Sequence, residues 1–376
     1  MKFDTKVVHS TLHNRSIKSK TTPIYQTSAF SFSSLEELEG FYEGKSPYLY
    51  TRSGNPNTDE LGDMVAALEG APAGVAAASG MGAILAGILA VAESGDHIIA
   101  AEDIYGGTYH LLNEELKTFG IKVSFADFSD HEEIVRNITP ETKLLYSESI
   151  TNPFLRLEDI KGMVSIAKRH GLRTMIDNTF ATPYLMNPYN DGVDIVAHSA
   201  TKYIGGHSDV TAGVTVGPDE LMAKARNKVI NLGMNLSPHE AWLTVRGCKT
   251  LSLRMKQQCD NAEKLAEALD GYEGVKTVYY PKKASEKGSG AIVTIELEEH
   301  NDIHRFFTGL SWVKIVPTLA GVETTVSYPQ GTSHRALTDE AREKIGVNPQ
   351  VVRISVGIED AEDIIKAFKD AVDSSK

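Results

Sequence analysis

Residues 173–202 read RTMIDNTFATPYLMNPYNDGVDIVAHSATK and contain two short apolar runs that both end in polar residues. The first run, Arg173–Ile176, is followed by Asp177, and the second, Ile195–Ala197, is followed by His198. Short apolar runs bounded in this way predict buried strands. Parallel strands bind ligands at their carboxyl ends, so this stretch predicts the centre of a sheet with a site along one rim.

Similar apolar runs recur on both sides of this stretch, at Val75–Ser79, His97–Ala101, Lys122–Phe125, Lys143–Glu148 and Val214–Val216. Helix-like segments separate several of them, such as Gly107–Phe119 and Asp159–His170. Strands alternating with helices of this length predict an α/β fold in which most strands are parallel. The polar residues that end these runs are therefore expected to converge on one rim of the sheet.

The two ends of the chain depart from this pattern. The first 54 residues have too few apolar positions to form a core of their own, so we expect them to pack on a neighbour such as another subunit. Beyond Pro238–Leu269, which predicts one long helix with Ser237 as its N-cap, a second and smaller α/β unit is expected. The predicted division is an N-terminal extended segment at 1–54, a large domain at 55–240 and a small C-terminal domain at 241–376. The small domain includes the expected strands Ala291–Leu297 and Val351–Val356 and the closing helix Ala361–Val372.

The charge balance argues against nucleic acid as a partner. Among 376 residues, 38 are Lys or Arg and 50 are Asp or Glu, which gives a net charge of −12. Binding along a phosphate backbone needs a basic face. The two cysteines, Cys248 and Cys259, are too few for a disulfide framework, which is typical of a reducing compartment.

No membrane partner is expected either. The amino-terminal residues lack an apolar run, so no secretory signal is predicted and a cytoplasmic location is expected. Residues 71–92 carry no charge, yet they are rich in Ala and Gly and include Pro72. A buried strand, a glycine turn and a buried helix explain this stretch better than a membrane span.

Ser79-Gly80-Met81-Gly82 lies between an expected strand and an expected helix. Glycines at such a turn let backbone N–H groups face a phosphate at the helix N-terminus. The stretch lacks the Lys of a Walker loop and the third glycine of the dinucleotide fingerprint. Taken alone, it is better explained as a tight turn between a strand and a helix.

Ser199-Ala200-Thr201-Lys202 contains the Ser-x-x-Lys pattern of β-lactamases, but the companion Ser-Asp-Asn and Lys-Thr-Gly motifs are missing from the sequence. A desolvated lysine at a strand end has another use, because its neutral amine attacks aldehydes. Asp177 would hold a protonated ring nitrogen, and the hydroxyls of Ser199 and Thr201 would hold a phosphate. An aldehyde, a basic ring nitrogen and a phosphate together describe pyridoxal phosphate.

Longer motifs carry a resemblance that covers nearly the whole chain. They are TPIYQT at 22–27, DNTFATPY at 177–184, HSATKYIGGHSD at 198–209 and VRISVGIED at 352–360. In this order they resemble the Cys/Met-metabolism group of pyridoxal-phosphate enzymes, which comprises cystathionine γ-lyases, β-lyases and γ-synthases, methionine γ-lyases and acylhomoserine sulfhydrylases. The resemblance implies a fold type I, transferase-like α/β architecture, with a mostly parallel central sheet and a smaller C-terminal α/β domain. It also implies a homo-oligomer that is a dimer of dimers.

The resemblance implies catalytic roles for three residues. Lys202 matches the lysine that forms the Schiff base with the cofactor and then carries protons. Asp177 matches the partner of the ring nitrogen. Tyr105 matches the tyrosine that stacks on the ring.

Further cofactor and substrate contacts follow from the same resemblance. Phosphate contacts are implied for Gly80, Met81, Ser199 and Thr201, and from a neighbouring subunit for Tyr50 and Arg52. Substrate contacts are implied for Asn152, Thr318 and Arg353. No metal is expected, because His9 and His13, and likewise His300 and His304, lack a third ligand.

The leading hypothesis is a carbon–sulfur lyase of transsulfuration that cleaves a sulfur amino acid, cystathionine first, by elimination. Methionine γ-lyases typically have a cysteine where this chain has Gly107, and many cystathionine γ-lyases have a glutamate where it has Pro317. Weak cleavage of methionine and a relaxed preference at the distal end of the substrate are therefore expected. The alternatives are γ-replacement on an acylated homoserine, as in cystathionine γ-synthase or a sulfhydrylase, and a non-catalytic carrier of pyridoxal phosphate.

Overall fold

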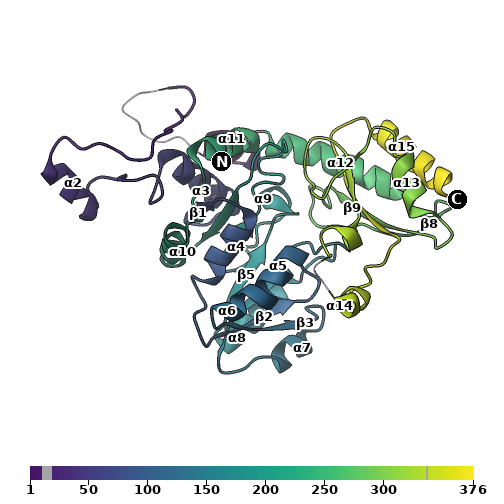
Figure 1. Ribbon diagram of the computed structural model, residues 1–376, viewed down its shortest axis with the longest axis horizontal. Helices are drawn as coiled ribbons and strands as arrows, with labels where there is room; N and C mark the ends of the chain where they lie inside the picture. The colour runs from purple at the N-terminus through teal and green to yellow at the C-terminus, as the bar shows by residue number, and fades with distance from the viewer. Residues whose placement is uncertain (11–18, 336–337) are drawn as a thin grey trace.

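The computed structural model describes residues 1–10, 19–335 and 338–376. Figure 1 shows three parts: an N-terminal arm that projects from the body and includes α2 (Leu35–Tyr42), a central part built on a large sheet, and a smaller C-terminal part that ends in α15 (Ala361–Ser375). The arm touches the body mainly at its base, so its apolar side chains Leu35 and Tyr42 are exposed.

In the described part of the chain, the large sheet has seven strands in the order β1-β7-β6-β5-β4-β2-β3. Their bounds are β1 Ala73–Ala77, β2 His97–Ala101, β3 Lys122–Ala126, β4 Thr142–Glu148, β5 Arg173–Asp177, β6 Ile195–His198 and β7 Gly213–Gly217. Strands β3, β2, β4, β5 and β6 pair in parallel, whereas β7 is antiparallel to both of its neighbours. The expected mostly parallel sheet is confirmed.

The single reversed strand has a local cause. Residues 199–212 link β6 to β7 without an intervening helix, so the chain cannot cross over to make a parallel pair. Thr201 closes this link, because its backbone N–H donates to Ala212 O and its Oγ1 accepts from Ala212 N. The link also contains Lys202. The bonds between Thr201 and Ala212 therefore fix the connection in which Lys202 lies.

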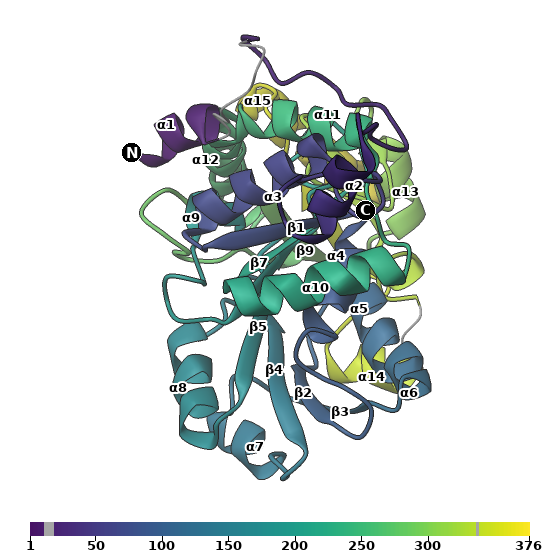
Figure 2. The ribbon, with the colours of Figure 1, turned by 90° about the vertical axis from the view of Figure 1, so that its left-hand side faces the viewer.

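Helices flank the large sheet (Figure 2). They are α3 Pro56–Glu69, α4 Gly80–Ile88, α5 Gly106–His110, a π-helical turn Leu111–Glu115, α6 Leu116–Thr118, α7 His131–Arg136, α8 Ile160–His170, α9 Thr182–Leu185, α10 Asp219–Asn231 and α11 Pro238–Cys248; α1 Phe3–His9 packs beside α3. Every residue of β2 and of β7 is buried, as expected when both faces of a sheet are covered.

The C-terminal part has a five-stranded sheet, within the described residues, in the order β10-β11-β12-β9-β8. Its elements are β8 Val275–Tyr279, β9 Ile292–Leu297, α13 Ile303–Gly309, β10 Lys314–Ile315, β11 Thr325–Ser327, a 3-10 turn Pro329–Gly331, α14 Asp339–Lys344, β12 Val351–Ser355 and α15. The smaller C-terminal α/β unit is therefore confirmed. Helix α12 (Leu251–Leu269) joins the two parts, because its first half packs in the core of the large sheet and its second half in the core of the small one. The domain limits at 54 and 240 stay predictions.

Two expected helices differ from the structure. The long helix expected over Pro238–Leu269 is two helices, α11 and α12, which are interrupted at Lys249 and Thr250. The helix expected over Gly107–Phe119 is continuous but contains the π-helical turn. Ser237 is the N-cap residue of α11, as expected, and Pro238 lies in the first turn of this helix.

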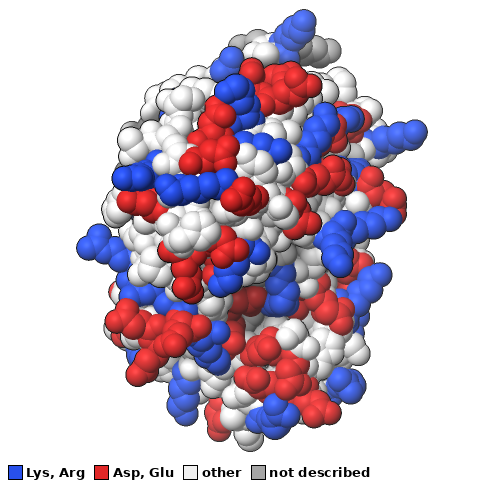
Figure 3. Space-filling view, turned by 90° about the vertical axis from the view of Figure 1, so that its right-hand side faces the viewer, with Lys and Arg blue, Asp and Glu red and all other residues white. Residues whose placement is uncertain are grey.

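Acidic and basic side chains are interspersed over the face on the C-terminal side of the molecule (Figure 3). A hollow lies near the middle of this face, between the two parts of the chain. Among the described residues, no helix is both long and apolar enough to cross a membrane.

Candidate active site

A cavity of about 220 Å³ lies where the carboxyl ends of the central strands meet the C-terminal part. Ten of the twelve predicted site residues line it: Gly80, Met81, Tyr105, Asn152, Asp177, Ser199, Thr201, Lys202, Thr318 and Arg353. They come from the ends of β1, β2, β4, β5 and β6 and from β12 and the loop before β11. The polar residues at the strand ends therefore converge on one cavity, as expected.

Lys202 and Thr318 meet across the two parts of the chain. Lys202 Nζ donates a hydrogen bond of 2.6 Å to Thr318 Oγ1. Burial, and next the nearby positive charge of Arg353, lower the pKa of Lys202 to about 8. About a tenth of this lysine is therefore the neutral, nucleophilic amine at pH 7, which is far more than for an ordinary lysine.

Asp177 ends β5 and is nearly buried. Its Oδ1 accepts hydrogen bonds from the backbone N–H of Thr179 at 2.9 Å and from Thr179 Oγ1 at 2.5 Å. Burial raises the pKa of the Asp177 carboxyl despite these two donors. A carboxylate in this position favours a cationic partner such as a protonated ring nitrogen.

The start of α4 makes an anion-binding turn. Ser79 is extended and caps the helix, with its Oγ accepting from Gly82 N at 3.1 Å. Gly80 and Met81, which open the helix, line the cavity, and a helix N-terminus favours an anion there. Gly80 is required by packing, because a Cβ there would lie 2.6 Å from Ser199 Cβ. Ser199 and Thr201 line the same end of the cavity, but the Thr201 hydroxyl already donates to Ala212 O at 3.1 Å.

Arg353 is a buried cation that lines the cavity. Its side chain is 2% exposed, and its Nη1 donates to Asn152 Oδ1 at 2.9 Å. Burial lowers the pKa of Arg353 to about 10, so the guanidinium is still charged at neutral pH. Within the described residues, its hydrogen-bond acceptor is a neutral amide. A buried charge is costly without an ionic partner, so this arginine is poised for an anionic group from a ligand.

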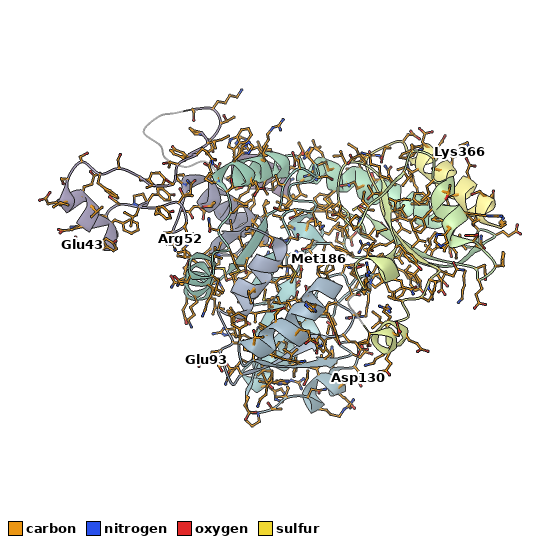
Figure 4. All side chains as sticks on the ribbon, in the orientation of Figure 1. Glu43, Arg52, Glu93, Asp130, Met186 and Lys366 are labelled. Carbon is orange, nitrogen blue, oxygen red and sulfur yellow. The ribbon has the colours of Figure 1, made fainter. Side chains whose placement is uncertain are left out.

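Tyr50 and Arg52 lie outside the cavity of their own chain. Both are at the base of the N-terminal arm; Figure 4 labels Arg52 there and Glu43 towards the tip of the arm. Tyr50 is 44% exposed, and the Arg52 guanidinium lies over its ring and donates to Ile230 O at 3.3 Å. The prediction that this pair completes the site of another subunit stays a prediction.

Glu148, Thr179 and His334 were not predicted as site residues. Glu148 and Thr179 line the cavity, and His334 supports Asn152 by a bond of 3.1 Å between His334 Nε2 and Asn152 O. Burial lowers the pKa of His334 to about 4, so its ring is neutral. Glu148 and Thr179 each stand at or just beyond the end of an expected strand, which was the available signal. Of the four histidines considered as metal ligands, His9, His300 and His304 do not line the cavity, and His13 lies outside the described residues.

The residues that line the cavity suit pyridoxal phosphate for three independent reasons. Lys202 has a lowered pKa, the buried Asp177 carboxyl forms no salt bridge within the described residues, and the backbone at Gly80 leaves no room for a side chain. Lys202, Asp177 and Tyr105 would hold its aldehyde carbon, ring nitrogen and ring face, and the start of α4 would hold its phosphate. The protein is therefore of the class of fold type I pyridoxal-phosphate enzymes.

Comparison with known families narrows this class. The chain belongs to the family described as "Cys/Met metabolism PLP-dependent enzyme", which matches residues 4–373, and its cofactor is pyridoxal 5'-phosphate. The expected membership of this family is confirmed.

Relatives within the family carry different reaction names. The chain is 40% identical to cystathionine β-lyase of Bacillus subtilis and 39% identical to cystathionine γ-synthase/O-acetylhomoserine (thiol)-lyase of the same bacterium, each alignment covering 94% of this chain and 91% of the relative. A crystal structure of cystathionine γ-lyase from Lactobacillus plantarum, complexed with L-serine, has a TM-score of 0.94 and 34% identity over 100% of this chain and 99% of its own. An O-acetylhomoserine (thiol)-lyase from Campylobacter jejuni, with a pyridoxyl-lysine, has a TM-score of 0.94 and 28% identity over 100% of both chains. The protein is therefore a transsulfuration enzyme whose reaction these names leave open.

Proposed function

We propose that this protein is a carbon–sulfur lyase that cleaves cystathionine by elimination. The observation that carries the proposal is the buried Arg353 guanidinium, paired with Asn152 and facing the same cavity as Lys202. It supplies a bidentate site for the carboxylate of an amino acid next to the group that moves its proton. Several relatives at 37–40% identity are named as β- or γ-lyases, which supports elimination over replacement.

The residues divide the work as follows. When bound, pyridoxal phosphate supplies an electron-withdrawing ring that makes the α-proton of an attached amino acid acidic. Arg353 and Asn152 fix the substrate carboxylate, which orients the Cα–H bond. Lys202 Nζ, once neutral, accepts the α-proton, and Thr318 Oγ1 sets where Nζ lies. Proton transfer by a positioned group such as Lys202 is worth about 10²–10⁴-fold in rate. Asp177 keeps its negative charge close to the ring nitrogen.

The products identify the bond that breaks. β-Elimination of cystathionine with one water gives homocysteine, pyruvate and ammonia, whereas γ-elimination gives cysteine, 2-oxobutyrate and ammonia. We therefore propose to incubate the loaded enzyme with cystathionine and to identify the keto acid and the thiol, with Lys202→Ala as the inactive control. Formation of either pair of products supports a lyase, and the identity of the keto acid assigns the position of cleavage.

The second candidate is γ-replacement, in which cysteine displaces the acyl group of an O-acylhomoserine to give cystathionine and the free carboxylate. It is favoured by the 39% identity to a γ-synthase. A kcat/KM for O-acetylhomoserine plus cysteine above that for cystathionine would replace the lyase assignment with this one. A cofactor-loaded protein that turns over neither substrate would instead support the non-catalytic carrier.

The site is proposed to be complete only in an oligomer. The exposed arm with Tyr50 and Arg52 is available to reach the phosphate end of a second copy's cavity. Closed symmetry makes such an exchange reciprocal, so a dimer, or a dimer of dimers, is the expected assembly.

A further inference from the structure

Glu148 is a second carboxyl at the ring-nitrogen end of the cavity. It is the last residue of β4, and in the parallel register of the sheet it lies directly opposite Asp177, the last residue of β5. Both residues line the cavity, and Glu148 is only 6% exposed. Two neighbouring carboxyls in a buried site do not both ionise at low cost, so one of them is expected to keep its proton.

Glu148 also holds the start of the helix that presents Tyr105. Glu148 Oε1 accepts a hydrogen bond of 2.8 Å from the backbone N–H of Tyr105. Tyr105 is the N-cap residue of α5, and no side chain of its own segment caps that helix. Since a backbone N–H at this position needs an acceptor, Glu148 provides it from a different strand. The side chain therefore links the residue expected to lie on the ring face with the strand next to Asp177.

The groups around Glu148 decide which carboxyl keeps the proton. Within the described residues, the titratable and charged groups that surround it are Asp103 after β2, Tyr105 at α5, Tyr146 on β4, Arg156 after β4, Asp177 on β5 and Arg353 on β12. Arg156 is engaged elsewhere, since its guanidinium donates two bonds of 2.8 Å to Asp103 and one of 3.4 Å to Glu158. Arg353 is directed at Asn152.

The surroundings of Glu148 favour its neutral form over its ionised form. Burial first, and the Asp177 carboxyl second, raise the pKa of Glu148 well above its usual range. Asp177 in contrast accepts two bonds from Thr179, which favour its ionised form. A protonated carboxyl offers one oxygen that accepts from Tyr105 N and one O–H that donates.

We propose that Glu148 is a positioning residue that keeps its proton in the folded protein, holds Tyr105 in place through the Tyr105 backbone, and leaves Asp177 as the negative charge that faces the ring nitrogen. The proposal rests on the roles of Asp177 and Tyr105 toward the cofactor, and it holds for an eliminating or a replacing enzyme alike. It explains how a second carboxyl group can lie beside Asp177 without adding a second negative charge. It also makes Glu148 replaceable by a neutral side chain of the same shape.

Glu148→Gln and Glu148→Ala separate the shape of the side chain from its charge. Glutamine reproduces the protonated acid, because its amide oxygen accepts and its NH₂ group donates, whereas alanine removes the acceptor of Tyr105 N. We expect Glu148→Gln to bind pyridoxal phosphate within about threefold of wild type. We expect Glu148→Ala to bind it about tenfold to a hundredfold more weakly, the range for one buried group left unpaired. Binding is measured on the apo-protein by cofactor-induced fluorescence quenching.

Infrared difference spectroscopy of the apo-protein tests the proton itself. Wild type minus Glu148→Gln at neutral pH should contain the C=O stretching band of a protonated carboxyl, and wild type minus Asp159→Asn, a change at a surface carboxylate, should not. The proposal is overturned if the Glu148-dependent band is that of a carboxylate, or if Glu148→Gln loses the cofactor as alanine is expected to. If the alanine variant does not fold, cofactor binding and the infrared spectrum of the glutamine variant alone test the proposal. Neither readout depends on turnover, so failure of the proposed lyase reaction would leave this test intact.

Discussion

At the residue scale, the pKa of Lys202 predicts how fast the cofactor becomes attached at each pH. Attachment needs the neutral amine, and the Lys202 pKa of about 8 means that the neutral fraction rises about tenfold per pH unit below 8 and levels off above it. We expect the rate at which apo-protein is loaded with pyridoxal phosphate to follow this curve, measured by stopped-flow absorbance. A rate that still rises tenfold per unit between about pH 8.5 and 10, as for an ordinary lysine with a pKa of about 10.4, would contradict the assignment.

Arg353 predicts a selective loss of substrate affinity. Arg353→Lys keeps the positive charge but loses the bidentate geometry toward a carboxylate. Loss of one charge-assisted hydrogen bond of about 1.5–3 kcal/mol corresponds to about a tenfold to hundredfold loss in kcat/KM. Steady-state kinetics should show this loss mainly in KM, with cofactor content unchanged. The matched change Arg305→Lys, on the exposed face of α13, should have no effect, and an equal loss there would remove Arg353 from the substrate site.

Single residues were predictable where a strand end determines their place. Asp177 directly follows one apolar run, and Lys202 lies in the segment that follows the next strand, so the parallel sheet places both near one rim. Glu148 also ends a strand, but its importance depends on its register against Asp177 and on the bond to Tyr105 N, which are tertiary facts. The placement of His334 likewise depends on packing between the two parts of the chain.

At the element scale, the first turn of α4 contains a matched pair of glycines. A Cβ at Gly80 would lie 2.6 Å from Ser199 Cβ and 2.7 Å from Ser199 Oγ, whereas a Cβ at Gly82 has its nearest neighbours at 3.5 Å. Gly80→Ala must therefore displace the segment that precedes Lys202, at a cost of about 1–3 kcal/mol. Gly82→Ala should cost little or stabilise the helix slightly.

Chemical denaturation of the apo-proteins and titration with pyridoxal phosphate measure both effects. Gly80→Ala should be less stable and bind the cofactor more weakly, and Gly82→Ala should match wild type in stability. The same affinity and stability for the two variants would show that the close approach at Gly80 does not shape the phosphate end.

The interruption between α11 and α12 shows why some element boundaries could not be predicted. Residues 238–269 contain no proline after the first position, so local pattern favours one helix. In the structure, a Cβ at Gly247 would lie 2.0 Å from Gly205 O, so the helix packs directly on the loop that follows Lys202. The Arg254 guanidinium donates to Gly247 O at 3.0 Å, in the helix, and to Tyr203 O at 2.7 Å, in the loop. The interruption is thus created by tertiary packing at the site.

At the scale of the whole molecule, the projecting arm predicts activity shared between subunits. Arg52→Ala should lower cofactor retention by about tenfold to a hundredfold, through loss of a charge-assisted contact worth roughly 1.5–3 kcal/mol. Lys202→Ala should lose turnover. If Arg52 serves a neighbouring site, a mixed dimer of the two variants contains one intact site.

Subunit exchange between these two variants is the measurement. After random mixing, activity should return to about a quarter of wild type, because half of the dimers are mixed and each has one intact site of two. Lack of recovery despite exchange proven by native mass spectrometry, or a fully active monomer, would place Arg52 in the site of its own chain.

Lys202 is the residue expected to carry the cofactor, and every other role in the site is defined relative to it. Borohydride treatment of the yellow holo-protein, followed by proteolysis and mass spectrometry, locates the lysine onto which pyridoxal phosphate becomes fixed. We predict a single modified peptide containing Lys202, and no fixation in Lys202→Ala. Fixation on another lysine, or a protein that takes up no pyridoxal phosphate, would contradict the central claim.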